Sequence, residues 1–451
     1  MRWYSKSAEA TGTSPRRWLA LPLCPLPPYP PHVTDSDPLS ARDAALRVLA
    51  AVRAQPPLRV PLDDALGMVL ADDIVSPIDI PAHRTSSMDG YAVRAADVRG
   101  ALSARPSLLR LVDRIPAGSA PAGAVGPGEC ARVFTGSRVP DGADSVVRQE
   151  DAAAEGDSIQ VFDDRDAGAN LRRPGEDLRR STVAVAAGTR LTPAHLGILA
   201  ALAEAAPMVV RRPRVAILCG GDEVVDVDRP DEILSGRKVG SASTHALLAL
   251  VRESGGEPVD LGIASDGVDS IRAHLMRAVD ADLIVTAGGI SVGDHDHVRA
   301  AVVASGGTID FWRARIRPGG PIGAGTIAGL PWVGLPGNPV SAMVTFELFV
   351  RPAIRRMSGH AAPFRRSRTV RTVEPIHLRP RLQHFLRAIV TDAAGRRDAR
   401  LTGPQGSGIL SSMAAANALL IVPEGQHETP AGAELQALLL DETDHQREPA
   451  F

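Results

Sequence analysis

The chain is poor in cysteine, has almost no net charge and lacks a long apolar run. Its three cysteines, Cys24, Cys130 and Cys219, are odd in number and share no metal-site spacing, which excludes a disulfide framework. A net charge of −2 leaves no basic surface for nucleic acid. No stretch reaches the roughly 18 apolar residues of a membrane helix. These absences favour a cytoplasmic protein and predict neither nucleic-acid nor membrane partners.

At 451 residues the chain is too long for a single hydrophobic core, and its pattern of apolar and turn-forming residues changes several times. Short β-like runs are flanked by helical patterns in the first half, which is typical of an insertion into a helical domain. From Pro213 strands and helices alternate, which predicts a mostly parallel sheet covered on both faces. We expect a multidomain α/β protein with these segments: a disordered Pro-rich extension (1–37), a helical linker domain (38–81 plus 165–208), the inserted β-rich domain (82–164), a three-layer α/β/α domain (209–359), a C-terminal β-barrel-like domain (360–441) and a tail (442–451).

Hydrophobic periodicity predicts the elements of the α/β domain. The predicted strands are 214–218, 259–264, 283–287 and 309–315. The predicted helices are 241–254, 267–279, 295–304 and 339–350. Before this domain, Ser40 offers an N-cap for one helix, and Thr192 followed by Pro193 begins another over 192–203.

Two glycine-rich turns carry the clearest binding signal. Cys219-Gly-Gly-Asp-Glu223 and Ala287-Gly-Gly-Ile-Ser-Val-Gly-Asp-His-Asp296 each follow an apolar run. Such corners let backbone N–H groups approach an anionic ligand. The acids there would repel a bare phosphate, so the pattern predicts a bridging hard cation. The expected backbone donors are Gly221, Gly288, Gly289, Ser291 and Gly293, and the expected metal ligands are Asp222, Glu223 and Asp296.

Other motifs fit either an anion site or a structural role, and the sequence leaves both open. The turn Pro336-Gly337-Asn338-Pro339 is rigid and precedes a helix, so it could cradle an anion or only stiffen a loop. Arginines alternate along one predicted strand face that ends at Arg317. Arg172 is close in the sequence to Glu176 and Asp177. It could form a structural ion pair with one of these acids or bind a ligand.

Taken in order, seven strings resemble the molybdopterin molybdenumtransferase family, which includes the gephyrin C-terminal domain. They are SSMDGYAV (86–93), RVFTGSRVPDGADSVVRQE (132–150), GANLRRPGED (168–177), GGDEV (220–224), GGISVGDHD (288–296), RPGGP (317–321) and LPGNPVSAM (335–343). The strings follow the family's order, and the resemblance extends over roughly residues 40–440. The resemblance is therefore specific for the family and less so for its activity.

The resemblance implies an enzyme that inserts molybdate into adenylylated molybdopterin and releases AMP with the help of Mg²⁺. It also implies a homodimer with an active site shared between subunits, a molybdopterin adenylyltransferase upstream and molybdoenzymes downstream. The α/β domain becomes the molybdopterin-binding domain. Carrying the family's roles onto the matched positions gives three groups of residues. Glu223, Asp266 and Asp296 would form the acidic wall of the cleft, and Arg387 and Ser407 would contact molybdate. The residues that would approach the cleft from the partner subunit are Asp89, Thr135, Arg172 and Asp177.

The chain departs from the family's pattern in the binding loops. Side chains of the family with hydroxyl, amide, acidic or lysine groups are replaced here, whereas Arg317 keeps a cation. The replacements are Cys219, Gly220, Ser241-Ala242-Ser243, Ala287 and Gly320. Each lost hydrogen bond to a charged ligand costs about 1.5–3 kcal/mol unless another group replaces it. The candidates for compensation are Arg313, Arg315 and Lys238.

Three functions follow from these observations. The retained acids favour an active molybdenum-inserting transferase. The lost donors leave open a non-catalytic paralogue that binds or carries molybdopterin. A nucleotide enzyme that relies on the sheet domain alone is disfavoured, because the matches at 86–93 and 132–150 lie outside that domain.

Overall fold

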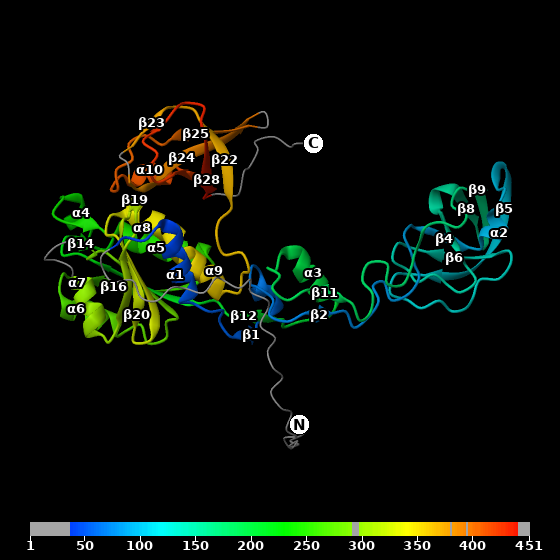
Figure 1. The fold of residues 1–451 in the computed structure, drawn as a ribbon. Coiled ribbons are helices and arrows are strands. Elements are labelled where there is room, and N and C mark those ends of the chain that lie inside the picture. Colours follow the sequence, from blue (N-terminus) through cyan, green and yellow to red (C-terminus); the bar gives the residue numbers. More distant parts are fainter. Residues whose placement is uncertain (1–36, 291–296, 379–380, 394–395, 441–451) are drawn as a thin grey trace, which may run out of the picture. The chain divides into compact units, whose positions relative to one another are not determined.

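The computed structural model describes residues 37–290, 297–378, 381–393 and 396–440 (Figure 1). The chain forms two compact units, one of residues 59–209 and one of the segments before and after it. The predicted tail 442–451 and nearly all of the predicted extension 1–37 lie outside the described residues. The finer division into domains stays a prediction.

A six-stranded sheet forms the centre of the second unit, with the strand order β16-β13-β17-β21-β20-β18. The strands are β13 (Arg214–Gly220), β16 (Glu257–Ala264), β17 (Leu283–Ala287), β18 (Thr308–Arg313), β20 (Pro321–Ile327) and β21 (Leu330–Leu335). β13 pairs in parallel with β16 and β17, and β17 with β21, whereas β20 is antiparallel to both of its neighbours. The expected mostly parallel sheet is confirmed.

Helices cover both faces of this sheet. Alternate residues of each strand point to opposite faces, so each strand contributes side chains to two separate buried clusters. Val215 and Ile217 of β13 belong to one buried cluster, and Ala216 and Leu218 belong to the other. The first cluster includes residues of α1 (Ala41–Ala50), α5 (Ala242–Glu253), α8 (Pro339–Thr345), the π-helix η3 (Phe346–Val350) and α9 (Arg351–Met357). The second includes residues of α6 (Val268–Leu275) and α7 (His297–Ala304).

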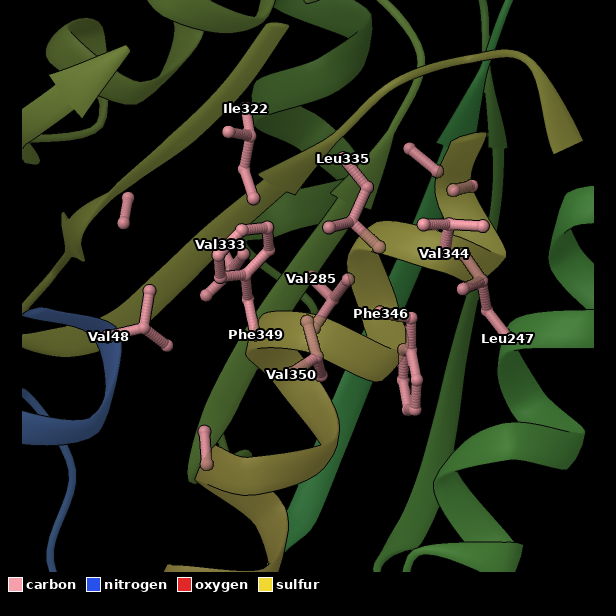
Figure 2. Close-up of a cluster of buried hydrophobic side chains, with 14 of the residues drawn as sticks. Val48, Leu247, Val285, Ile322, Val333, Leu335, Val344, Phe346, Phe349 and Val350 are labelled. Atoms are coloured by element: carbon pink, nitrogen blue, oxygen red, sulfur yellow. The ribbon is translucent and has the colours of Figure 1, made fainter. Parts of the chain in front are cut away.

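Figure 2 shows part of the first cluster, where strand and helix side chains meet. Val285 and Val333 come from adjacent strands of the sheet, and Phe346 and Phe349 come from the helical layer. Phe346 is fully buried, as are most members of the cluster. Burying a side chain of this size stabilises the fold by about 1.5–3 kcal/mol.

A closed five-stranded barrel follows the α/β layers. Its strands are β22 (Ser367–Thr372), β24 (Gln383–Ala393), β25 (Arg396–Leu401), β26 (Ala418–Val422) and β28 (Glu434–Leu439). They follow the order β24-β25-β22-β28-β26, and β26 pairs again with β24. The short strand β19 (Ile316–Arg317) leaves the α/β layers and pairs with β24, so it connects the sheet domain to the barrel. The predicted barrel-like C-terminal region is confirmed.

The other compact unit contains a second six-stranded sheet with the order β7-β4-β6-β5-β9-β8. Its strands are β4 (Gly90–Val93), β5 (Leu102–Ile115), β6 (Glu129–Val133), β7 (Ser145–Arg148), β8 (Ala152–Glu155) and β9 (Ser158–Asp163). The helix α3 (Pro193–Ala201) begins after Thr192, whose backbone N–H donates to His195 Nδ1 at 3.1 Å. The expected cap and first-turn proline are both present.

Short elements complete the described chain. The helical ones are η1 (Leu62–Ala65), α2 (Ala95–Val98), η2 (Gln149–Asp151), α4 (Pro230–Leu234) and α10 (Leu410–Ala414). The strands are β1 (Pro57–Arg59), β2 (Ile74–Val75), β3 (Thr85–Ser86), β10 (Leu171–Arg172), β11 (Val183–Val185), β12 (Met208–Val210), β14 (Val224–Val225), β15 (Val239–Gly240), β23 (Ile376–His377) and β27 (Glu428–Thr429). Within the described residues, no helix combines the length and apolarity needed to cross a membrane.

Candidate functional site

A cavity of about 770 Å³ lies at the carboxyl ends of β13, β17 and β21. In open α/β sheets this edge is where ligands bind. The cavity collects most of the described residues that the sequence predicts for the site. Those on its lining are Gly221, Glu223, Asp266, Gly288, Gly289, Arg317, Pro336, Gly337, Asn338, Pro339 and Ser407.

Glycine is required where the two turns approach each other. Gly288 has φ +98°, and a Cβ on it would lie 2.7 Å from the carbonyl oxygen of Gly220. Gly221 has φ +140°, and a Cβ on it would lie 2.8 Å from Glu223 Oε2. A side chain at either position would therefore displace backbone or the Glu223 carboxylate. The glycines allow backbone and an acid to converge on the cavity, as the sequence predicts.

The acidic wall of the cavity contains Glu223 and Asp266. Asp222 is absent from the lining, and its Oδ1 instead accepts the backbone N–H of Asp266 at 2.9 Å. The predicted residues Ser291, Gly293 and Asp296 lie outside the described residues. Within the described part of the chain, no three His, Cys, Asp or Glu side chains are grouped to hold a metal.

The two carboxylates nevertheless fit Mg²⁺. This ion keeps several waters and is held by one or two carboxylates together with phosphate oxygens of a substrate. Glu223 and Asp266 are both exposed at the cavity and supply the hard oxygen donors that Mg²⁺ prefers. A preformed protein cage is not needed for such a site.

Arg317 supplies the positive charge of the cavity, and no other arginine or lysine among the described residues lines it. Of the candidates for compensation, Arg315 donates to Glu424 at 2.8 Å and Arg313 is exposed away from the lining. Lys238 Nζ donates to the carbonyl oxygen of Asp222 at 2.6 Å. None of these three side chains lines the cavity, whose described lining contains two carboxylates and one guanidinium.

A turn of the C-terminal barrel closes one side of the cavity with Gln405, Gly406 and Ser407. Asn338 Nδ2 donates to Ser407 Oγ at 3.1 Å, which ties this turn to the head of α8. Gln405 was not predicted from the sequence. Its position two residues before Ser407, in a Gly-Pro-Gln-Gly-Ser run, is the signal that could have indicated it.

Arg387, predicted to contact molybdate, is fully buried and absent from the cavity lining. Its guanidinium donates to the carbonyl oxygens of Pro404, Gln405 and Gly406 at 3.4, 3.1 and 2.9 Å, and its Nε donates to Ser412 Oγ at 3.0 Å. Burial lowers the pKa of this guanidinium. In the described structure Arg387 shapes the turn that carries Ser407, and its contact with molybdate stays a prediction.

The departures from the family's pattern gather at the same cavity. Cys219, Gly220, Ser241, Ala242, Ser243 and Ala287 all line it, whereas Gly320 does not. Burial raises the pKa of the Cys219 thiol to about 11, so this thiol remains protonated at neutral pH. Because these positions line the cavity, the family's hydroxyl and amide donors are absent from the place where a ligand would lie.

In the other unit, Asp89 and Thr135 form a close pair. The Thr135 backbone N–H and hydroxyl donate to Asp89 Oδ1 at 2.7 and 2.8 Å, and these bonds hold the pKa of Asp89 below its usual range. Arg132 lies over the rings of Tyr91 and Phe134, with 5.1 and 4.9 Å to the ring centroids, and adds to the lowering.

Arg172 and Asp177 are exposed in the same unit. Glu176 accepts the backbone N–H of Arg173 at 2.9 Å, and among the described residues Arg172 has no ion pair with Glu176 or Asp177. Asp177 lines an open hollow of about 570 Å³ with Arg173 and Arg179. Their predicted approach to the partner's cleft stays a prediction, as does that of Asp89 and Thr135.

Three family models match almost all of the described chain. They are the MoeA N-terminal region (domain I and II) over 39–203, a probable molybdopterin binding domain over 216–356 and the MoeA C-terminal region (domain IV) over 369–440. Molybdopterin molybdenumtransferase 2 of Mycobacterium tuberculosis is 38% identical over 397 residues, covering 86% of this chain and 97% of the relative. The chain belongs to the molybdopterin molybdenumtransferase family.

Further relatives agree with this assignment. Molybdopterin molybdenumtransferase of Nostoc sp. is 34% identical and covers 83% of this chain and 87% of its own. The crystal structure of the molybdopterin biosynthesis protein moeA of Pyrococcus horikoshii superposes with a TM-score of 0.74 at 29% identity, covering 89% of this chain and 100% of that one. The likeness to the family therefore extends over the α/β sheet domain that carries the cavity, the C-terminal barrel and the other compact unit.

Proposed function

We propose that this protein is a molybdopterin molybdenumtransferase that inserts molybdate into adenylylated molybdopterin and releases AMP. Family membership supports the activity. The observation that carries the detail is the cavity, where the backbone of two glycine turns, the acids Glu223 and Asp266 and the cation Arg317 face one space. This combination suits a ligand that has both a metal-bridged phosphate and a bare oxyanion.

Each wall of the cavity has a distinct task in this proposal. Glu223 and Asp266 hold Mg²⁺, which when bound neutralises charge on the pyrophosphate bridge. Arg317 and Ser407 bind molybdate. Backbone N–H groups of the glycine turns orient the pterin nucleotide beside it. Catalysis is therefore mainly positioning and electrostatic stabilisation by preorganised groups.

The proposal extends to assembly and pathway. We place the protein in the cytoplasm as a homodimer in which Asp89, Thr135, Arg172 and Asp177 complete the partner's cleft. A molybdopterin adenylyltransferase supplies the substrate, and molybdoenzymes receive the product. The support is the family resemblance of residues 86–93, 132–150 and 168–177.

AMP release tests the activity. Purified protein given adenylylated molybdopterin, Mg²⁺ and molybdate is expected to release AMP in proportion to the cofactor formed. No release under conditions where a related molybdenumtransferase is active would refute the transferase. Tight molybdopterin binding without AMP release would favour a carrier paralogue instead. This is the relevant alternative because the described lining of the cavity contains a single cation, Arg317.

A further inference from the structure

We propose that Asp222 is a positioning residue, whose carboxylate fixes the place of Asp266 and does not bind the cation. The inference deepens the proposed function and rests on it, because Asp266 is there a Mg²⁺ ligand. It departs from the prediction that Asp222 binds the metal. The geometry of the two turns carries it.

Asp222 and Asp266 bridge two turns that follow adjacent strands of the sheet. β13 ends at Gly220 and β16 ends at Ala264, and these last residues pair with each other. Two residues further on, Asp222 Oδ1 accepts the Asp266 N–H at 2.9 Å, and Asp266 Oδ2 accepts the Asp222 N–H at 3.3 Å. The bonds are reciprocal, so each turn restrains the other.

Three further contacts hold the Asp222 turn in place. The Gly221 N–H donates to the Ala264 carbonyl oxygen at 3.1 Å, and the Val224 N–H closes the turn onto the Gly221 carbonyl oxygen at 3.0 Å. Lys238 Nζ donates to the Asp222 carbonyl oxygen at 2.6 Å. The backbone of Asp222 is thus anchored, and from this backbone its carboxylate accepts the Asp266 N–H.

The cavity lining distinguishes the three acids of these two turns, within the part of the chain that the structure describes. Glu223 and Asp266 line the cavity, and Asp222 does not. A carboxylate oxygen can accept a hydrogen bond from a backbone N–H, and the neutral amide oxygen of asparagine can do the same. A Mg²⁺ ligand depends instead on negative charge and hard oxygen donors. Asn and Ala at position 222 therefore distinguish the two roles.

The first arm of the test measures AMP release over a range of Mg²⁺ concentrations. For Asp222→Asn we expect kcat within about threefold of the wild type and an unchanged half-saturating Mg²⁺ concentration, because Asn Oδ1 still accepts the Asp266 N–H. For Asp222→Ala we expect kcat to fall about tenfold or more, the usual size of a lost charge-assisted hydrogen bond. Asp228→Ala, an exposed acid of the same loop region, is the matched control and should behave as the wild type.

The second arm needs no substrate. Deuterium uptake by a peptide that contains the Asp266 amide should be faster in Asp222→Ala than in the wild type, and unchanged in Asp222→Asn, because only alanine removes the acceptor. This arm remains valid if the wild type releases no AMP, so failure of the proposed function and failure of the inference are distinguishable.

Two results would overturn the inference. One is an Asp222→Asn variant that loses as much activity as Asp222→Ala and needs at least tenfold more Mg²⁺, which is the behaviour of a metal ligand. The other is identical uptake at Asp266 in the wild type and Asp222→Ala, which would show that the carboxylate does not restrain that turn.

Discussion

The Asn338 amide and the Ser407 hydroxyl are joined by a hydrogen bond of 3.1 Å across the cavity rim. Asn338 precedes α8, and Ser407 belongs to the barrel turn. The bond therefore links the two parts of the chain that would enclose molybdate. Side chains in direct contact are expected to couple energetically.

We expect Ser407→Ala and Asn338→Ala each to raise the KM for molybdate by about three- to tenfold. Ser407 is the residue that we propose to bind molybdate, and the Asn338 amide holds the Ser407 hydroxyl in place. The double variant should raise it by less than the product of the two effects. AMP release at graded molybdate concentrations measures all three values. Fully multiplicative effects would indicate that the two side chains act separately.

The buried Arg387 makes a prediction about stability. It has four hydrogen bonds to neutral acceptors and no carboxylate partner among the described residues. Arg387→Met leaves the carbonyl oxygens of Pro404 and Gln405 without the guanidinium donor, and that of Gly406 with only the Ile409 N–H at 3.3 Å. We expect a loss of about 2–4 kcal/mol in the free energy of unfolding. Urea denaturation measures the change.

Arg400→Met is the control for Arg387→Met. Arg400 is exposed on β25 of the same barrel. Exposed substitutions without special contacts change stability by roughly 0.5 kcal/mol or less. Equal losses for the two variants would mean that the hydrogen bonds of Arg387 contribute nothing specific.

Close packing of the glycine turns predicts a difference between two glycines with similar backbone. Gly288 and Gly306 both have positive φ, at +98° and +72°. A Cβ on Gly288 would collide with the Gly220 carbonyl oxygen, whereas nothing lies within 4 Å of one on Gly306. Gly306→Ala should cost about 1 kcal/mol for the backbone conformation alone, and Gly288→Ala about 3 kcal/mol or more. Urea denaturation with indistinguishable midpoints would contradict the contact.

The Asp89–Thr135 pair predicts a pH effect with a definite sign. The pKa of Asp89 is lowered first by the Thr135 backbone N–H and next by its hydroxyl. The contribution to stability is therefore present above the usual aspartate pKa and disappears as the pH falls through the lowered value. Thr135→Val should raise the pKa of Asp89 only in part, because the backbone bond remains. Carboxyl carbon NMR titration measures it.

Thr135→Ser keeps the hydroxyl and provides the control for this titration. It should leave the pKa of Asp89 near that of the wild type. If Thr135→Val also leaves that pKa unchanged, the side-chain hydrogen bond is not formed in solution.

A shared active site can be tested by mixing two inactive variants. Asp89→Asn and Glu223→Gln change residues that the proposal puts on different subunits of one cleft. Random mixing of subunits makes half of the dimers mixed, and each mixed dimer regains one intact site, so activity should return to about a quarter of the wild type. Mixtures that stay as inactive as the separate variants would place both residues in one subunit's site or exclude the dimer.

Much of the fold could be predicted from local patterns. The strands around Val215 and Leu283 are short apolar runs followed by glycine turns, and the structure has both at the predicted places. The hairpin β20–β21 was not predicted, because glycines and prolines interrupt its apolar pattern and obscure the strand signal. Its strands are held by pairing with β17 and β18, which a local pattern does not reveal.

The site was harder to predict than the fold. The motifs indicated which turns meet, but the direction of each side chain depends on tertiary hydrogen bonds. Asp222 points to the Asp266 N–H, and Arg387 points to the backbone of the 404–406 turn. Both partners are distant in the sequence, so nothing in the local pattern distinguishes a ligand from a residue that holds a turn.

The most direct measurement of the central claim is Mg²⁺-dependent AMP release by the wild type and by Glu223→Gln, with Glu155→Gln, an exposed acid in the other unit, as the control. The account predicts release by the wild type and Glu155→Gln, and a loss of at least about a hundredfold in Glu223→Gln, since a neutral amide replaces a charged ligand of the cation. Release by Glu223→Gln at the wild-type rate and with the wild-type Mg²⁺ requirement would contradict it.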